Sequence, residues 1–64
     1  MKTKRFIIEY ANYQMSEVEK LDISEDEKLQ RTRNITRAVH FCEIGAMTID
    51  ETMQQIIYAR SADF

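Results

Sequence analysis

Two helix-start signatures divide this 64-residue chain into three segments. Ser24 is followed three residues later by Glu27, and Thr48 is followed three residues later by Glu51. In such a capping box the hydroxyl accepts a hydrogen bond from the backbone N–H of the glutamate. The glutamate carboxylate in turn accepts one from the backbone N–H of the capping residue. The two boxes therefore predict that one helix begins after Ser24 and another after Thr48.

The residues that make tight turns are almost absent, because the chain has no proline and a single glycine, Gly45. This composition argues against an all-β fold, whose hairpins need turn residues. A glycine commonly closes a helix in a left-handed turn, and Gly45 stands three residues before Thr48. We therefore predict a single all-α domain with an antiparallel helical hairpin around Gly45 and helices at about 4–21, 25–44 and 49–60.

Apolar residues recur at steps of three and four, as on one face of a helix. The predicted buried stripes are Ile7, Tyr10, Ala11, Gln14, Val18 and Leu21 in the first helix, Leu29, Thr32, Ile35, Val39 and Cys42 in the second with Ala38 beside them, and Ile49, Met53, Ile56 and Ile57 in the third. Residues 5–10 also suit a strand that pairs across a dimer, since Phe, Ile and Tyr favour strands. The helical spacing continues to Leu21 and favours a helix there.

The small size of the chain makes its core marginal, because a domain of about 60 residues buries only roughly 60% of its unfolded surface. Cys42 is the only cysteine, so no internal disulfide can form. His40, Cys42 and Glu43 are the nearest approach to a metal site, but helical positions two apart point away from each other. We expect no metal and no cofactor. Self-association, most simply as a two-fold dimer, is the expected remedy for the small core.

The charges add up to −2 and lie in blocks of alternating sign. Lys2, Lys4 and Arg5 make the start basic, residues 17–27 are strongly acidic, and residues 28–37 are basic. Such blocks more often order helices within a bundle than bind polyanions. The sequence lacks an apolar run of the roughly 18 to 20 residues that a membrane span needs. The basic start meets Glu9 before an apolar run develops, so we expect that it is not a signal peptide. We therefore expect a cytoplasmic protein, of a size and charge typical of bacterial or phage accessory proteins.

One face of the second predicted helix is a candidate binding surface. Arg33, Arg37, His40 and Ile44 share this face, and Phe41 projects beside Arg37 and Ile44. Aromatic and arginine side chains outside a core are typical of interface hot spots. The alternative for Phe41 is that its ring fills a gap against the first helix. We predict a noncatalytic protein that binds another protein through these five residues and regulates, inhibits or scaffolds it.

The main alternative function is nucleic-acid binding or a transcriptional accessory role, with phosphates contacted by basic side chains. The candidate residues are Lys2, Lys4, Arg5, Arg33 and Arg37. A weaker alternative is that the acidic run between Val18 and Lys28 imitates a phosphate backbone. Catalysis is not expected, because His40 is the only histidine and no nucleophile or carboxylate is clearly aimed at it.

Overall fold

The protein is a bundle of three α-helices in the computed structural model, which describes residues 3–61. The helices are α1 (Lys4–Glu19), α2 (Glu25–Glu43) and α3 (Ile49–Ser61). No strand occurs within the described range, so the predicted all-α class is confirmed. Residues 5–10 lie inside α1, and the strand alternative for this segment is wrong.

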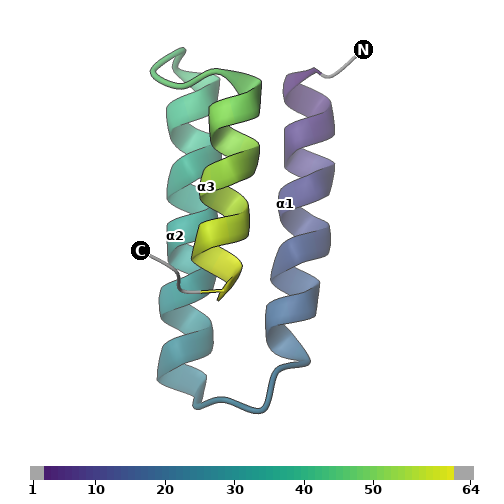
Figure 1. Ribbon diagram of the computed structural model, residues 1–64, viewed down its shortest axis with the longest axis vertical. Coiled ribbons are helices and arrows are strands. Elements are labelled where there is room, and N and C mark those ends of the chain that lie inside the picture. The colour runs from purple at the N-terminus through teal and green to yellow at the C-terminus, as the bar shows by residue number, and fades with distance from the viewer. Residues whose placement is uncertain (1–2, 62–64) are drawn as a thin grey trace.

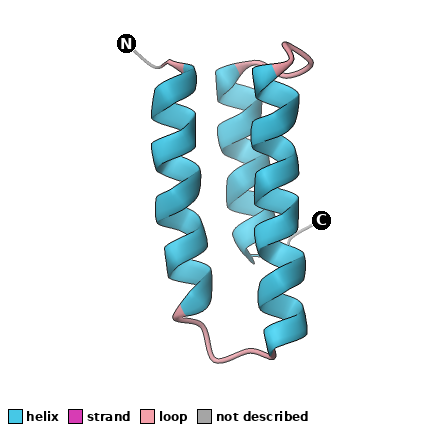
Figure 2. Ribbon diagram, turned by 180° about the vertical axis from the view of Figure 1, so that it is seen from behind, coloured by secondary structure: helices cyan, strands magenta, loops and turns pink. Residues whose placement is uncertain are grey.

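The three helices run roughly parallel to the long axis of the molecule, and each contacts the other two. The chain descends through α1, returns through α2 after residues 20–24, and descends again through the shorter α3 after residues 44–48 (Figure 1). In the view from the opposite side, α1 and α2 lie nearer the viewer than α3 (Figure 2). One side of the α1–α2 pair is therefore covered by α3.

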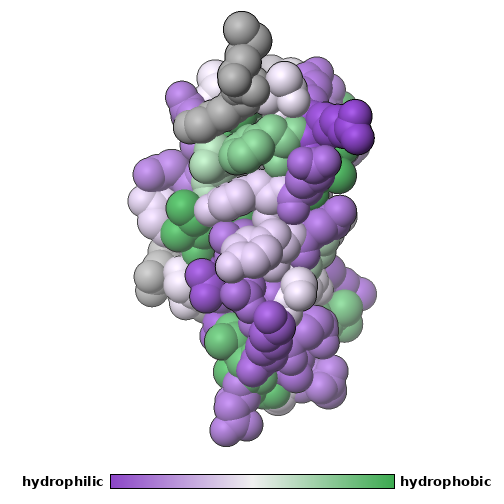
Figure 3. All heavy atoms as spheres, turned by 90° about the vertical axis from the view of Figure 1, so that its right-hand side faces the viewer, coloured by the Kyte–Doolittle hydropathy of each residue, from purple (hydrophilic) through white to green (hydrophobic). Residues whose placement is uncertain are grey.

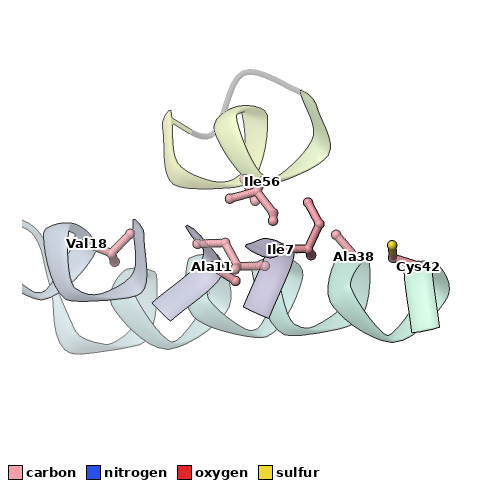
Figure 4. Packing of buried hydrophobic residues seen from close by; sticks show 8 residues of the cluster. Ile7, Ala11, Val18, Ala38, Cys42 and Ile56 are labelled. Carbon is pink, nitrogen blue, oxygen red and sulfur yellow. The ribbon is translucent and has the colours of Figure 1, made fainter. Parts of the chain in front are cut away.

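The core lies between the three helices, and each helix contributes to it. Ile56 of α3 points toward the α1–α2 pair, with Ala11 and Ile7 of α1 on either side below it and Ala38 of α2 beyond Ile7 (Figure 4). The buried apolar residues are Ile7, Ala11, Val18, Ile35, Ala38, Cys42, Ile56 and Ala59. These positions confirm most of the predicted stripes of α1 and α2.

Two predicted core residues are in fact about half exposed. Leu29 is 51% exposed, and Ile57 is 45% exposed. In α3 the buried line runs through Thr52, Ile56 and Ala59, and a step of one residue turns Ile57 about 100° away from it. Near the start of α2, the long side chains of Lys28 and Arg31 are mostly buried in place of Leu29.

Capping residues begin all three helices. At α3, the Glu51 backbone N–H donates to Thr48 Oγ1 (3.1 Å), and the Thr48 N–H donates to Glu51 Oε1 (3.2 Å). Ser24 Oγ accepts from the Glu27 N–H (3.2 Å), while the Glu27 carboxylate pairs with Arg31 (3.6 Å). Thr3, which the sequence analysis did not single out, caps α1 by accepting from the Phe6 N–H (3.2 Å).

The helix ends also follow local chemistry. α1 ends at Glu19 instead of Leu21, because the Leu21 N–H already bonds to the Val18 oxygen in a tighter turn (3.1 Å). After α2, Gly45 has a φ of +80° and the Ala46 N–H donates to the Phe41 oxygen (2.8 Å). This left-handed conformation is one that side chains other than glycine rarely adopt.

Candidate functional site

Two neighbouring hollows follow one flank of α2 and share Asn34 and Arg37 as lining residues. The first, of about 260 Å³, is lined by Asn34, Arg37, Ala38, Phe41, Met47 and Gln55. The second, of about 640 Å³, is lined by Asp26, Leu29, Gln30, Arg33, Asn34 and Arg37. We call Leu29, Arg33, Asn34, Arg37 and Phe41 together the α2 surface. It runs along most of the length of α2.

Phe41 forms the apolar end of the α2 surface. Phe41 is 39% exposed, and its ring centroid lies 6.1 Å from that of His40. The backbone oxygen of Phe41 accepts hydrogen bonds from Ala46 and Met47, which fixes the turn beside the ring. The hollow that the ring lines is formed by α2, Met47 and Gln55 of α3. Phe41 therefore lies on the α3 side of α2, and the alternative in which it fills a gap against α1 is wrong.

Arg33 and Arg37 form the basic part of the α2 surface. Arg37 donates to the side-chain oxygen of Asn34, which holds the guanidinium over the boundary between the two hollows. Within residues 3–61, neither Arg33 nor Arg37 forms an ion pair with a carboxylate. The two guanidinium groups are thus available to an acidic group from outside.

The remaining basic residues that the structure describes are mostly engaged within the chain. Lys4 Nζ donates to the Glu43 backbone oxygen (3.1 Å), and Arg31 donates to the Arg60 backbone oxygen (2.9 Å). Each places a cation at the C-terminal end of a neighbouring helix, where the helix dipole favours positive charge. Arg5 pairs with Glu9 (3.6 Å). Lys2, the other predicted basic contact, lies outside the described residues.

The structure brings together three of the five predicted partner-binding residues, Arg33, Arg37 and Phe41. His40 and Ile44 are exposed nearby, but neither lines the two hollows. Ile44 caps the end of α2 and is 61% exposed. Asn34, Met47 and Gln55 were missed by sequence reasoning. Asn34 could have been found from its position three residues before Arg37, whereas Met47 and Gln55 reach the hollow only through tertiary packing.

Cys42 and His40, two of the three residues weighed as a metal cluster, lie in different environments. The thiol of Cys42 is buried in the core, while His40 is exposed beside Phe41. No group of three or more His, Cys, Asp or Glu side chains within residues 3–61 is placed to hold a metal ion.

Glu17 lies in the acidic part of the chain, and its carboxyl group has a pKa below the ordinary value. Hydrogen bonds from Lys20 and from the Tyr13 hydroxyl lower the pKa of this carboxyl, and the positive charge of Lys20 adds to the effect. The Lys20 ammonium lies 3.2 Å from one carboxylate oxygen, and the Tyr13 hydroxyl lies 3.1 Å from the other. Glu17 is therefore ionised at neutral pH and ties the last turns of α1 together.

No protein-family model, curated protein or solved structure matches the chain. Within the described residues, no helix has the length and apolar character needed to span a membrane.

Proposed function

We propose that this protein is a noncatalytic binding module that attaches to another protein through the α2 surface and thereby regulates, inhibits or scaffolds it. The observation that supports this most directly is the position of Phe41. An exposed aromatic ring borders a hollow and has an arginine without an ion pair beside it. Aromatic and arginine side chains are the residues that most often dominate the binding energy of protein interfaces.

The chemistry of the α2 surface suggests what its partner presents. An apolar side chain fits the hollow between Phe41, Ala38 and Met47. Carboxylates suit Arg33 and Arg37, which lie one helical turn apart and can each hold a carboxylate in a bidentate hydrogen bond. The proposed partner is therefore a protein segment that combines an apolar anchor with acidic groups.

As part of this proposal, α2 and α3 form an antiparallel helical hairpin around Gly45, which fixes both sides of the Phe41 hollow. Gln55 of α3 and Met47 of the turn lie opposite α2, so the hollow has preformed walls. As part of the same proposal, the module forms homodimers and acts in the cytoplasm, where the free thiol of Cys42 suits a reducing compartment.

The test is affinity purification of the tagged chain from its native cell, with and without nuclease, beside two variants. We expect a protein partner that survives nuclease and is lost with Phe41→Ala. The partner should be retained with Tyr13→Ala, which removes an exposed aromatic ring from α1 instead. Equal recovery with Phe41→Ala and the unmodified chain would exclude the α2 surface as the binding site.

A second candidate function is nucleic-acid binding, which Arg33 favours because it forms no ion pair with any residue that the structure describes. In that case binding would weaken steeply as salt rises, because neutralised phosphates release counterions. Arg33→Ala and Arg37→Ala would lower the affinity for a duplex oligonucleotide, and Phe41→Ala would leave it unchanged. Companions lost on nuclease treatment would support this alternative over the first.

A further inference from the structure

A second groove lies between α1 and α2. Its lining residues are Ile8, Ala11, Asn12, Met15, Thr36, Val39 and Glu43, around a volume of about 200 Å³. None of these lining residues belongs to α3. Figure 2 shows the molecule from this side, with α1 and α2 nearer the viewer than α3. Ile8 is 42% exposed there. This α1–α2 groove differs from the α2 surface in having a single charged residue, Glu43.

We propose that a second copy of this chain covers the α1–α2 groove, with α1 lying antiparallel to α1 of the other copy. In a two-fold dimer each surface meets its own copy, so a surface rich in one charge repels itself. The α2 surface would bring Arg33 and Arg37 of both copies together. The α1–α2 groove is largely uncharged and can face itself without that cost.

The charges at the two ends of α1 are complementary in the antiparallel arrangement. Arg5 and Glu19 each lie seven residues from Asn12, one before it and one after it. Seven residues make almost two helical turns, so all three share one stripe of α1. When the two-fold axis passes beside Asn12, Arg5 of each copy lies opposite Glu19 of the other. The intrachain pair of Arg5 with Glu9 is exposed at 3.6 Å, and such pairs are weak enough to rearrange.

A stable dimer needs only a modest share of the surface of the chain. A standard interface buries about 800 Å² of each partner, which is about a sixth of the 4538 Å² accessible surface of the chain. The α1–α2 side is one of the three sides of the bundle (Figures 1 and 2). Figure 3 shows the adjoining outer face of α1, where polar side chains predominate and apolar ones are scattered among them.

The proposed dimer leaves the α2 surface free. Thr36 and Val39 line the α1–α2 groove, whereas Asn34, Arg37 and Phe41 line hollows on the opposite flank of α2. The buried line of Ile35, Ala38 and Cys42 separates the two flanks. A dimer would therefore carry two copies of the α2 surface. The inferred interface rests on the proposed homodimerisation, and it can be tested separately from the binding of another protein through the α2 surface.

Sedimentation of the purified chain over a range of concentrations is the first test. We expect the unmodified chain to reach a dimer, and Ile8→Glu to raise the dissociation constant at least about tenfold, because it places a charge in an apolar contact. Arg5→Glu should also weaken the dimer, and Arg5→Glu with Glu19→Arg should restore it. Circular dichroism would check that each variant keeps its helices. A chain that stays monomeric at all concentrations would overturn the proposal.

Disulfide trapping locates the interface. Cys42→Ala removes the native thiol, and Asn12→Cys then places one cysteine at the expected two-fold axis. We expect a covalent dimer on mild oxidation of this variant, because the two residues 12 would face each other. Arg33→Cys in the same background is the control on the α2 surface and should stay largely monomeric. Trapping through residue 33 but not residue 12, or loss of the dimer with Phe41→Ala alone, would place self-association on the α2 surface and overturn the proposal.

Discussion

Gln14 carries an unsatisfied polar atom in the core of the bundle. Its side chain is buried on the stripe of Ile7, Ala11 and Val18, and Oε1 has no hydrogen-bond partner among the residues described. A buried oxygen without a partner costs about 1–3 kcal/mol of stability. The position was evident from the sequence, where glutamine interrupts an apolar spacing. The sequence did not show that Oε1 of Gln14 lacks a hydrogen-bond partner, because this depends on which side chains of α2 and α3 lie near it.

Replacing Gln14 by methionine should therefore stabilise the protein. Methionine has nearly the same shape and no polar atom to satisfy, so we expect Gln14→Met to raise the free energy of unfolding by about 1 kcal/mol. Urea denaturation followed by circular dichroism would measure the gain. Gln30→Met, at an exposed position of α2, is the matched control and should change stability by far less. A loss of stability in Gln14→Met would mean that the amide has a polar partner after all.

The two capping boxes differ in the structure although their sequences look alike. At Thr48 both reciprocal hydrogen bonds form, whereas at Ser24 the glutamate turns to Arg31. The sequence therefore predicts where α2 and α3 begin. It does not predict the second hydrogen bond, because a glutamate at this position can pair with an arginine four residues on instead.

This difference predicts an asymmetry between the two glutamates. Thr48→Ala should lower the free energy of unfolding by about 1 kcal/mol, since it removes a helix cap. Glu51→Ala should also be destabilising, whereas Glu27→Ala should cost less, because it removes only a long ion pair (3.6 Å) whose carboxylate is largely exposed. Thermal or urea denaturation of the three variants would show the order. Equal losses for Glu27→Ala and Glu51→Ala would contradict the asymmetry.

The rotation of α3 about its axis is the main element-scale feature that the sequence analysis placed wrongly. Ile56 and Ile57 were both expected at the buried edge, yet Ile56 is fully buried and Ile57 is half exposed. Adjacent apolar residues leave the rotation of a short helix ambiguous. Here it is decided by Thr52, whose hydroxyl is satisfied by the Thr48 oxygen (2.7 Å) and can therefore be buried.

A charge scan of α3 tests this rotation. Ile56→Asp should prevent folding, because an unpaired carboxylate in the core costs far more than the stability of a small domain. Ile57→Asp should leave a helical, cooperatively unfolding protein, as its side chain already reaches solvent. Circular dichroism and one-dimensional NMR would distinguish folded from unfolded variants. Tolerance of Ile56→Asp would show that α3 is rotated differently.

At the scale of the whole molecule, the class and number of helices were predictable, since caps, glycine and apolar spacing all agree. The α2 surface was predictable only in part. Arg33, Arg37 and Phe41 could be grouped by helical spacing on one element. The walls that make hollows beside them, Met47 and Gln55, come from the turn and from α3. Their contribution depends on how α3 packs, which local sequence patterns do not encode.

Because all three helices share one core, the molecule should unfold as a single unit. Cys42 offers a direct test, since its thiol is buried and only 2% exposed, near the end of α2 that joins the turn to α3. We expect a thiol reagent to modify Cys42 only through opening of the bundle, with the same urea midpoint as the loss of helical signal. Labelling in native buffer at the rate of an unfolded peptide would show instead that this end of α2 opens by itself.

The same experiment connects stability to self-association. If a second copy binds only the folded chain, the urea midpoint must rise with protein concentration, because association adds to the free energy of the folded state. Ile8→Glu, which places a charge in the proposed interface, should remove this dependence and leave the midpoint of the dilute chain nearly unchanged. A midpoint independent of concentration in the unmodified chain would mean that the three helices alone supply its stability.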